Sequence, residues 1–133
     1  MMRSPQAYIA QIKARLLNSS IIEVFTVVDH HFSSDRGYIR VRFNLNNGDF
    51  LEASEYFYVQ DEQIIQARYR YQWMDNSQRV LRRRWDNAPH FREIATFPHH
   101  VHVDREDNVM PSHRFGILEL IDILESLLTI EEP

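Results

Sequence analysis

Histidine and arginine side chains are concentrated in residues 82–102, which read RRRWDNAPHFREIATFPHHVH. This segment holds four of the seven histidines, three consecutive arginines and an Asp-Asn pair. Histidine gives or takes a proton near neutral pH, and arginine presents a fixed fork of donors that matches a phosphate. The combination indicates chemistry on a phosphodiester or on another anion. A solvated surface loop with a chance cluster of histidines is the alternative interpretation.

Cleavage of RNA through its own 2′-hydroxyl is the first reaction that these residue types suit. It needs a base, an acid and cations beside the non-bridging phosphate oxygens. The candidate acids and bases are His90, His100 and His102. A carboxylate such as Asp86 can hold the tautomer of a catalytic histidine. The candidate phosphate ligands are Arg70, Arg82 and Arg84. The prediction is an endoribonuclease that needs neither a metal nor another cofactor.

A metal-dependent hydrolase is a second possibility. His100 and His102 are two residues apart on an expected strand, and His90 or Asp86 arrives from the segment before it. Such a set can bind zinc or a related ion. Three protein ligands with an open fourth position would suit hydrolysis.

A binding module without chemistry is the third possibility. In that case a basic face docks nucleic acid or a protein, and the histidines are structural. Exposed aromatic side chains would support RNA binding, because bases stack on them. Three aromatic residues of one strand instead fall on the expected core face, which argues against stacking there: Tyr69, Tyr71 and Trp73.

Two short motifs in the same region resemble a known family. They are Trp85-Asp86-Asn87-Ala88-Pro89-His90 and Phe97-Pro98-His99-His100-Val101-His102. Together they are similar to the signature of the TumE family, the toxins of small toxin–antitoxin pairs. The resemblance runs from about Tyr69 to Leu128. It implies a toxin whose partner is a helix-turn-helix antitoxin, and it favours RNA as the substrate.

Composition sets wider bounds. A chain of 133 residues with 44% apolar residues fits one domain, residues 1–133, with a real core. It has no cysteine, no apolar signal segment and no apolar run of the length that spans a membrane, so we expect a cytoplasmic protein that does not enter membranes. The net charge of −4 argues against non-specific coating of nucleic acid. The oligomeric state does not follow from the sequence.

Two amphipathic helices are expected, one near each end. Ser4-Pro5 is a helix-start signal, and Asn18-Ser19-Ser20 ends the first helix. Its core face is formed by Tyr8, Ile9, Ile12, Leu16 and Leu17. The second helix is expected over Phe115–Leu128, where apolar residues recur at spacings of three and four.

Strands are expected between the helices. Ile21–Asp29 is apolar on both sides, which predicts a strand covered on both faces, and His30-His31 then fall in a loop. Tyr38–Leu45 and Phe50–Val59 form a hairpin. A three-residue loop at 46–48 keeps apolar residues opposite one another, so it pairs Phe43 with Leu51 and Arg42 with Glu52.

A second hairpin brings arginines together. Ile65–Trp73 alternates cleanly, and a three-residue loop at 75–77 leads into Gln78–Asp86. This loop length places Tyr71 opposite Leu81 and sets like charges face to face as a ladder: Arg70 opposite Arg82, and Arg68 opposite Arg84. Like charges directly opposite are destabilising, so either carboxylates such as Glu52 reach over the ladder on a solvated face, or this face meets a polyanion.

The final expected strand is His99–Val103, followed by a polar loop, Asp104–Ser112. On this strand His100 and His102 share a solvent-facing side, His99 faces the other way, and Val101 packs inward. The order of elements predicts an α+β fold: a curved antiparallel sheet of about five to six strands, with an N-terminal and a C-terminal helix packed on one face. The other face is left open for binding.

Overall fold

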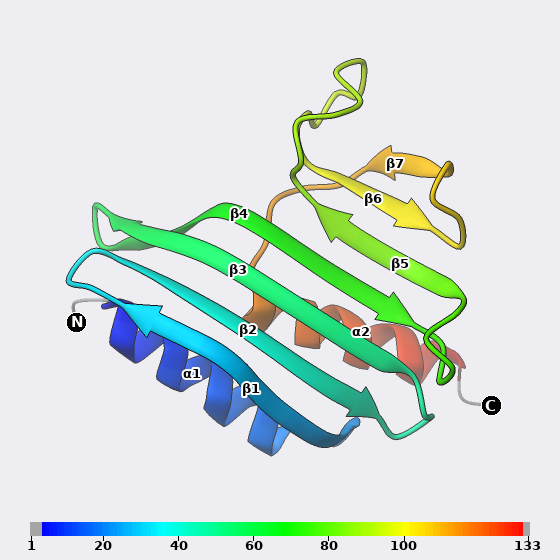
Figure 1. The fold of residues 1–133 in the computed structure, drawn as a ribbon, viewed down its shortest axis with the longest axis horizontal. Coiled ribbons are helices and arrows are strands. Elements are labelled where there is room, and N and C mark those ends of the chain that lie inside the picture. The colour runs from blue at the N-terminus through cyan, green and yellow to red at the C-terminus, as the bar shows by residue number, and fades with distance from the viewer. Residues whose placement is uncertain (1–3, 132–133) are drawn as a thin grey trace.

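A computed structural model of the chain describes residues 4–131. It contains two helices and one antiparallel sheet of seven strands (Figure 1). In chain order the elements are α1 (Pro5–Asn18), β1 (Ile22–Phe32), β2 (Arg36–Leu45), β3 (Phe50–Gln60), β4 (Gln63–Met74), β5 (Leu81–Asp86), β6 (His100–Val103), β7 (Val109–Pro111) and α2 (Ile117–Glu131). The predicted α+β class is confirmed. The sheet has more strands than predicted because the expected loop Asp104–Ser112 contains β7.

The strands follow one another across the sheet in the order β1-β2-β3-β4-β5-β6-β7, each antiparallel to the next. Both helices lie on the same face of the sheet, as predicted, and the opposite face is open (Figure 1). Among residues 4–131, neither helix is long and apolar enough to cross a membrane.

The first helix begins where its capping signal predicts. The Ser4 side chain accepts a hydrogen bond from the Ala7 amide, and Pro5 occupies the first turn. The side chains buried against the sheet are Tyr8, Ile9, Ile12 and Leu16. Leu17 was expected on this face but is 74% exposed. It follows Leu16 by about 100° around the helix, which turns it away from the sheet.

The β2–β3 hairpin has the predicted register. Phe43 lies opposite Leu51 and Arg42 opposite Glu52. Gly48 has a φ of 94°, the left-handed conformation that the end of a three-residue loop requires.

The prediction for the first strand was wrong in two respects. β1 is an edge strand, with Val24 and Val28 exposed, and is not covered on both faces. His30 and His31 belong to β1 itself, where they pair with Ile39 and Tyr38. Register shifts after Ile22 and after Val27 break the simple alternation that the sequence pattern assumes.

The β4–β5 register also differs from the prediction. Tyr71 lies opposite Trp85, and Arg70 opposite Asp86. The connection is longer than three residues because the Asp75 carboxylate accepts hydrogen bonds from the amides of Arg79 and Val80 and so stabilises a wider turn. The like-charged ladder therefore does not form.

A bulge in β4 changes which residues face the core. The β3–β4 pairing shifts between Tyr56 and Phe57, which leaves Ala67 without a direct partner and exposed. Ala67 and Ile65 thus leave the predicted core face. Gln66 turns inward, and its side-chain amide donates to Glu55.

Glu55 is a carboxylate with no exposed surface at the centre of the core. It accepts hydrogen bonds from the Tyr8 hydroxyl (2.6 Å) and from the Ile117 amide at the start of α2 (2.8 Å). Burial raises the pKa of Glu55 to about 7, although these hydrogen bonds favour its charged form. Both helices are therefore connected to the sheet through one side chain.

Candidate functional site

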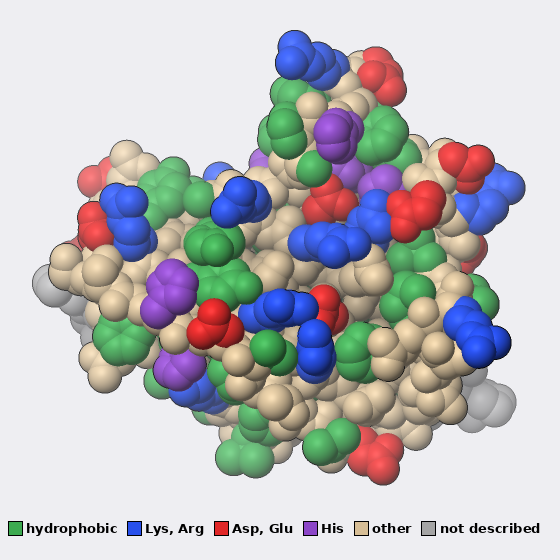
Figure 2. Space-filling view, viewed as in Figure 1, with side chains coloured by type: hydrophobic (Ala, Val, Ile, Leu, Met, Phe, Trp, Pro, Cys, Tyr) green, Lys and Arg blue, Asp and Glu red, His purple; other side chains and the backbone are tan. Residues whose placement is uncertain are grey.

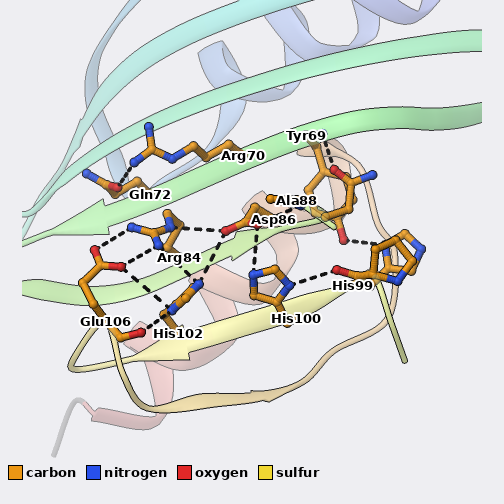
Figure 3. Close-up of polar contacts among 12 residues, drawn as sticks. Tyr69, Arg70, Gln72, Arg84, Asp86, Ala88, His99, His100, His102 and Glu106 are labelled. Atoms are coloured by element: carbon orange, nitrogen blue, oxygen red, sulfur yellow. Dashed lines mark hydrogen bonds and ion pairs between the residues drawn. The ribbon is translucent and has the colours of Figure 1, made fainter. Parts of the chain in front are cut away.

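Side chains on the open face form rows that cross the sheet, because opposite residues on adjacent strands share a face. One row runs through Arg70, Asp86 and His100 on β4, β5 and β6. The next runs through Gln72, Arg84 and His102 on the same strands. Figure 3 shows the side chains of these two rows lying next to each other.

Four side chains of these rows form the floor of a cleft of about 470 Å³, and Arg70 lies at its rim; the four are Arg84, Asp86, His100 and His102. The cleft is lined by Arg68, Tyr69, Arg70, Arg84, Asp86, Asn87, Ala88, His90, Phe91, His100, His102 and Glu106. Six of the seven predicted site residues are in this set, brought together from β4, β5, β6 and the loop before β6. Arg82 is the exception.

Asp86 lies at the centre of the cleft floor and is only 6% exposed. Its Oδ1 atom accepts a hydrogen bond from the Ala88 amide and lies 3.0 Å from Nε2 of His100. Its Oδ2 atom accepts a hydrogen bond from Nε of Arg84 at 3.2 Å. These contacts hold the Asp86 side chain from three sides.

The two ring nitrogens of His100 have different partners. Nδ1 lies 2.9 Å from the Pro98 carbonyl, which only accepts, so Nδ1 donates. Nε2 lies 3.0 Å from Oδ1 of Asp86. His100 therefore lies between a backbone carbonyl and the Asp86 carboxyl group.

The two ring nitrogens of His102 also have different partners. Its Nδ1 donates to the Glu106 carbonyl at 2.7 Å. Its Nε2 lies 3.2 Å from Nη2 of Arg84, a group that only donates, so Nε2 carries a lone pair. Asp86 Oδ2 is 3.7 Å from Nε2, too far for a hydrogen bond. The centroids of the two histidine rings are 4.9 Å apart.

Arg84 is neutralised by two carboxylates. Besides its bond to Asp86, it donates from both terminal nitrogens to Glu106, each at 2.6 Å. These hydrogen bonds lower the pKa of Glu106. The Glu106 side chain is 66% exposed, so it holds Arg84 from the solvent side of the cleft.

Arg68, Arg70 and His90 form the exposed rim of the cleft. Arg70 donates to the Gln72 side chain, and Arg68 lies over the Tyr56 ring. Among the ion pairs of residues 4–131, none involves Arg68 or Arg70. Their charges are therefore available to an anion that enters the cleft.

Arg82 lies apart from the other predicted residues. It pairs with Asp49 at 3.3 Å, and Asp49 also accepts from the indole nitrogen of Trp73. A register shift between Trp73 and Met74 places Arg82 at a bulge, so Arg82 lies directly opposite no residue of β4.

The expectation that His100 and His102 face solvent was wrong. They do share one face of β6, but they are only 2% and 3% exposed. Phe91, from the loop before β6, packs with its ring centroid 5.1 Å from His100 and 5.8 Å from His102. The sequence pattern gave no reason to place this loop over the strand.

Two residues that line the cleft, Glu106 and Asn87, were not predicted as site residues, and a third residue, His99, has its contacts beside the cleft. Glu106 was missed because it lies in the polar stretch after β6. Asn87 joins β5 to β4, accepting from the Tyr69 amide and donating to the Ala67 carbonyl. His99 stacks on Tyr69 and shares a hydrogen bond of 2.9 Å between its Nδ1 and the Tyr69 hydroxyl, and burial lowers the pKa of His99.

One set of residues has metal-ligand chemistry. A nitrogen of His100, a nitrogen of His102 and an oxygen of Asp86 all lie within 4.8 Å of one another. Both histidines fix Nδ1 on a backbone carbonyl, as metal-ligating histidines do, and direct Nε2 toward Asp86. The guanidinium of Arg84, however, already contacts both Asp86 and His102.

The fold and the cleft define a small α+β protein with a cleft of histidine, arginine and carboxyl side chains on the open face of its sheet. Residues 12–130 match the family described as Toxin TumE. The chain belongs to this family and is the toxin component of a toxin–antitoxin system, whose partner is an antitoxin. The match confirms the predicted resemblance and extends it toward the N-terminus. A search of curated proteins and of solved structures gave no match.

Proposed function

We propose that this toxin is a metal-independent endoribonuclease that acts on cytoplasmic RNA. The supporting observation is the pair of adjacent histidines on the cleft floor, with Nε2 of His100 beside the Asp86 carboxyl group and a lone pair on Nε2 of His102. An acid and a base side by side are what cleavage through the 2′-hydroxyl requires.

His102 is the general base. When the guanidinium of Arg84 turns from Nε2 to a phosphate oxygen, the lone pair of His102 is free to take the proton of the 2′-hydroxyl. The 2′-oxygen then attacks the adjacent phosphorus. The Nδ1–H bond to the Glu106 carbonyl keeps the ring in the tautomer that this step needs.

His100 is the general acid. Its Nε2 proton passes to the 5′-oxygen as the phosphorus–oxygen bond breaks, which leaves a 2′,3′-cyclic phosphate and a 5′-hydroxyl. Asp86 orients the ring until that point, as carboxylates do in triads. His102 gains one proton and His100 loses one, and exchange with water restores both.

Arg84 and Arg70 bind the phosphate. Arg84 already contacts His102 and Asp86, and Arg70 lies in the same row as Asp86 with its side chain exposed. Charge that develops on the non-bridging oxygens is stabilised by such preorganised donors. His90 lies on the rim and contributes to binding of the anion.

The experiment that tests this function is incubation of purified toxin with single-stranded RNA, with analysis of the product ends. We expect cyclic phosphate ends, and a loss of about 10²–10⁴-fold in rate for His102→Ala and for His100→Ala. His99→Ala is the matched control, because His99 contacts Tyr69 outside the proposed chemistry. If the folded toxin binds RNA but does not cleave it, the protein is a binding module.

Metal-assisted hydrolysis is a second candidate, favoured by the convergence of Asp86, His100 and His102. A divalent ion would have to displace the Arg84 guanidinium from His102 and from Asp86, so we rank it second. Cleavage by the metal-free protein in chelator supports the ribonuclease. Activity that appears only after zinc or manganese is added, with a 3′-phosphate or 5′-phosphate product, supports the metal hydrolase.

We also propose that the antitoxin partner is a helix-turn-helix protein. This rests on the family to which the chain belongs. Co-purification of the two proteins and sequencing of the partner test it.

A further inference from the structure

A third row of side chains crosses the open face, beside the two that form the cleft. His31, Tyr38, Tyr56 and Arg68 lie directly opposite one another on β1, β2, β3 and β4. His31 stacks on Tyr38 at 5.2 Å, and Tyr38 lies 4.3 Å from Tyr56 between ring centroids. The Arg68 guanidinium covers the Tyr56 ring at 4.7 Å. Figure 2 shows histidine, hydrophobic and cationic side chains together on this face.

This row borders a groove of about 530 Å³ at the ends of the β1–β2 and β3–β4 hairpins. Three aromatic side chains of the groove are more than one-third exposed: Phe32, Tyr56 and Tyr58. Clustered exposed apolar side chains mark binding surfaces, whereas scattered single ones need no explanation. We call this surface the aromatic groove, defined by His31, Phe32, Arg36, Tyr56 and Tyr58.

The aromatic groove adjoins the cleft. Arg68 lines the cleft and covers Tyr56, while the next residue, Ala67, lines the groove. Arg68 and Arg70 are two residues apart on one face of β4, a separation of about 7 Å. A phosphate bound at these arginines would thus place a neighbouring nucleotide next to the aromatic groove.

We propose that the aromatic groove stacks a nucleobase of the single-stranded RNA whose phosphate occupies the cleft. This inference rests on the proposed ribonuclease function, and it names single-stranded RNA as the substrate class. Bases stack on tyrosine rings and on arginine planes when they are not paired in a duplex. Arg68 then has two roles: its guanidinium stacks at the end of the row, and its charge attracts the phosphate.

Charge favours RNA over a protein as the occupant. Among the described residues, those that line the groove include the cation Arg36 and no carboxylate. Arg36 pairs with Asp35 at 3.4 Å, but both side chains are largely exposed, and such a pair is weak. Cations, exposed ring faces and continuity with the arginine rim match a polyanion with stacking bases.

The test compares two uncleavable probes in a binding titration. One is a 2′-O-methyl oligouridylate of about ten nucleotides, and the other is an abasic 2′-O-methyl strand of equal length and charge. We expect Tyr56→Ala to weaken binding of the oligouridylate roughly five- to a hundredfold and to leave binding of the abasic strand unchanged. Arg70→Gln should weaken both probes equally, because it contacts only the backbone.

Two controls guard against loss of folding. Tyr56→Phe keeps the ring and should bind both probes as the wild type does, whereas Tyr56→Leu keeps apolar area and should behave like Tyr56→Ala. Val24→Ala changes an exposed apolar side chain on β1 outside the groove and should alter neither affinity. Circular dichroism on each variant confirms that the sheet is intact.

Tyr56→Ala variants that bind both probes as tightly as the wild type, or that lose both equally, overturn the proposal. If they instead lose affinity for the antitoxin alone, the groove is the antitoxin interface and the proposal is wrong. The wild type could bind the oligouridylate more tightly than the abasic strand, with a preference that depends on Tyr56, and yet cleave no RNA. That result would support the stacking site and contradict the ribonuclease function.

Discussion

Nη2 of Arg84 lies 3.2 Å from Nε2 of His102, while the same guanidinium is held by both carboxylate oxygens of Glu106. In the resting cleft the Arg84 guanidinium therefore covers the proposed base, His102, and the Glu106 carboxylate holds that guanidinium in place. In the mechanism that we propose, the substrate phosphate competes with Glu106 for Arg84, and this competition exposes the lone pair of His102.

Replacing Arg84 and replacing Arg82 should have different effects. Arg84→Gln should lower the cleavage rate by about 10²–10³-fold, because it removes a donor aimed at developing charge. Arg82→Gln should leave the rate unchanged and lower the free energy of unfolding by about 1 kcal/mol, since buried Asp49 loses a partner. Rate measurements and urea unfolding of both variants check this. Equal rates for the two variants would remove Arg84 from the site.

The buried histidines should matter for stability as well as for activity. We expect His100→Ala and His102→Ala each to lower the free energy of unfolding by about 1–3 kcal/mol, because each leaves buried polar partners unmatched. His99→Ala removes a half-buried contact with Tyr69 and should cost less, about 1 kcal/mol, while sparing the chemistry. Unfolding curves beside rates test this, and inactivity of a stable His99→Ala variant contradicts it.

Glu55 should make the fold less stable as the pH rises. Burial raises the pKa of Glu55 from its ordinary value of 4.5 to about 7 in the folded protein. Between these values the unfolded chain releases the proton and the folded chain keeps it, so stability falls with rising pH by on the order of 3 kcal/mol. The cause is burial, because Glu55 has no exposed surface and lies at the centre of the core.

The Glu55→Gln variant tests this pH dependence. It keeps the shape of the side chain and cannot ionise, so its stability should lack the decline between about pH 4.5 and pH 7 that the wild type shows. Chemical unfolding at several pH values measures the difference. Parallel curves for the two proteins would mean that Glu55 is charged in the fold throughout.

Toxicity should depend on the antitoxin. Expression of the toxin alone should slow cell growth, and co-expression of the adjacent antitoxin should restore it, because the chain belongs to a family of such toxins. The His102→Ala variant should be harmless at equal soluble expression if RNA cleavage causes the toxicity. Growth curves with immunoblots for protein level provide the measurement. Normal growth with abundant folded wild type would contradict the toxin role.

The parts of the fold that were predicted correctly depend on short-range rules. Phe43 lies opposite Leu51 because a glycine-containing loop fixes the hairpin register, and α1 begins at Pro5 because Ser4 caps it. His100 and His102 share a face because strand residues alternate.

The errors arose where a single residue changes the local count. The bulge at Ala67 reverses the alternation of β4, and the Asp75 turn moves Arg70 from opposite Arg82 to opposite Asp86. Burial of the histidines depends on Phe91, whose position follows from tertiary packing and not from any periodicity. The aromatic groove was missed because its members come from three strands whose exposed rings pair only once the register is known.

The order of the strands has a consequence for how the molecule assembles. Every strand pairs with its neighbour in the chain, so the contacts that define the sheet are local in sequence, a property that speeds folding. All residues that line the cleft lie between Arg68 and Glu106, before α2. A nascent chain thus meets the partners of its cleft before it meets the helix whose first amide binds Glu55. Variants that weaken α2 should therefore fold to the cleft at a similar rate but unfold faster than the wild type.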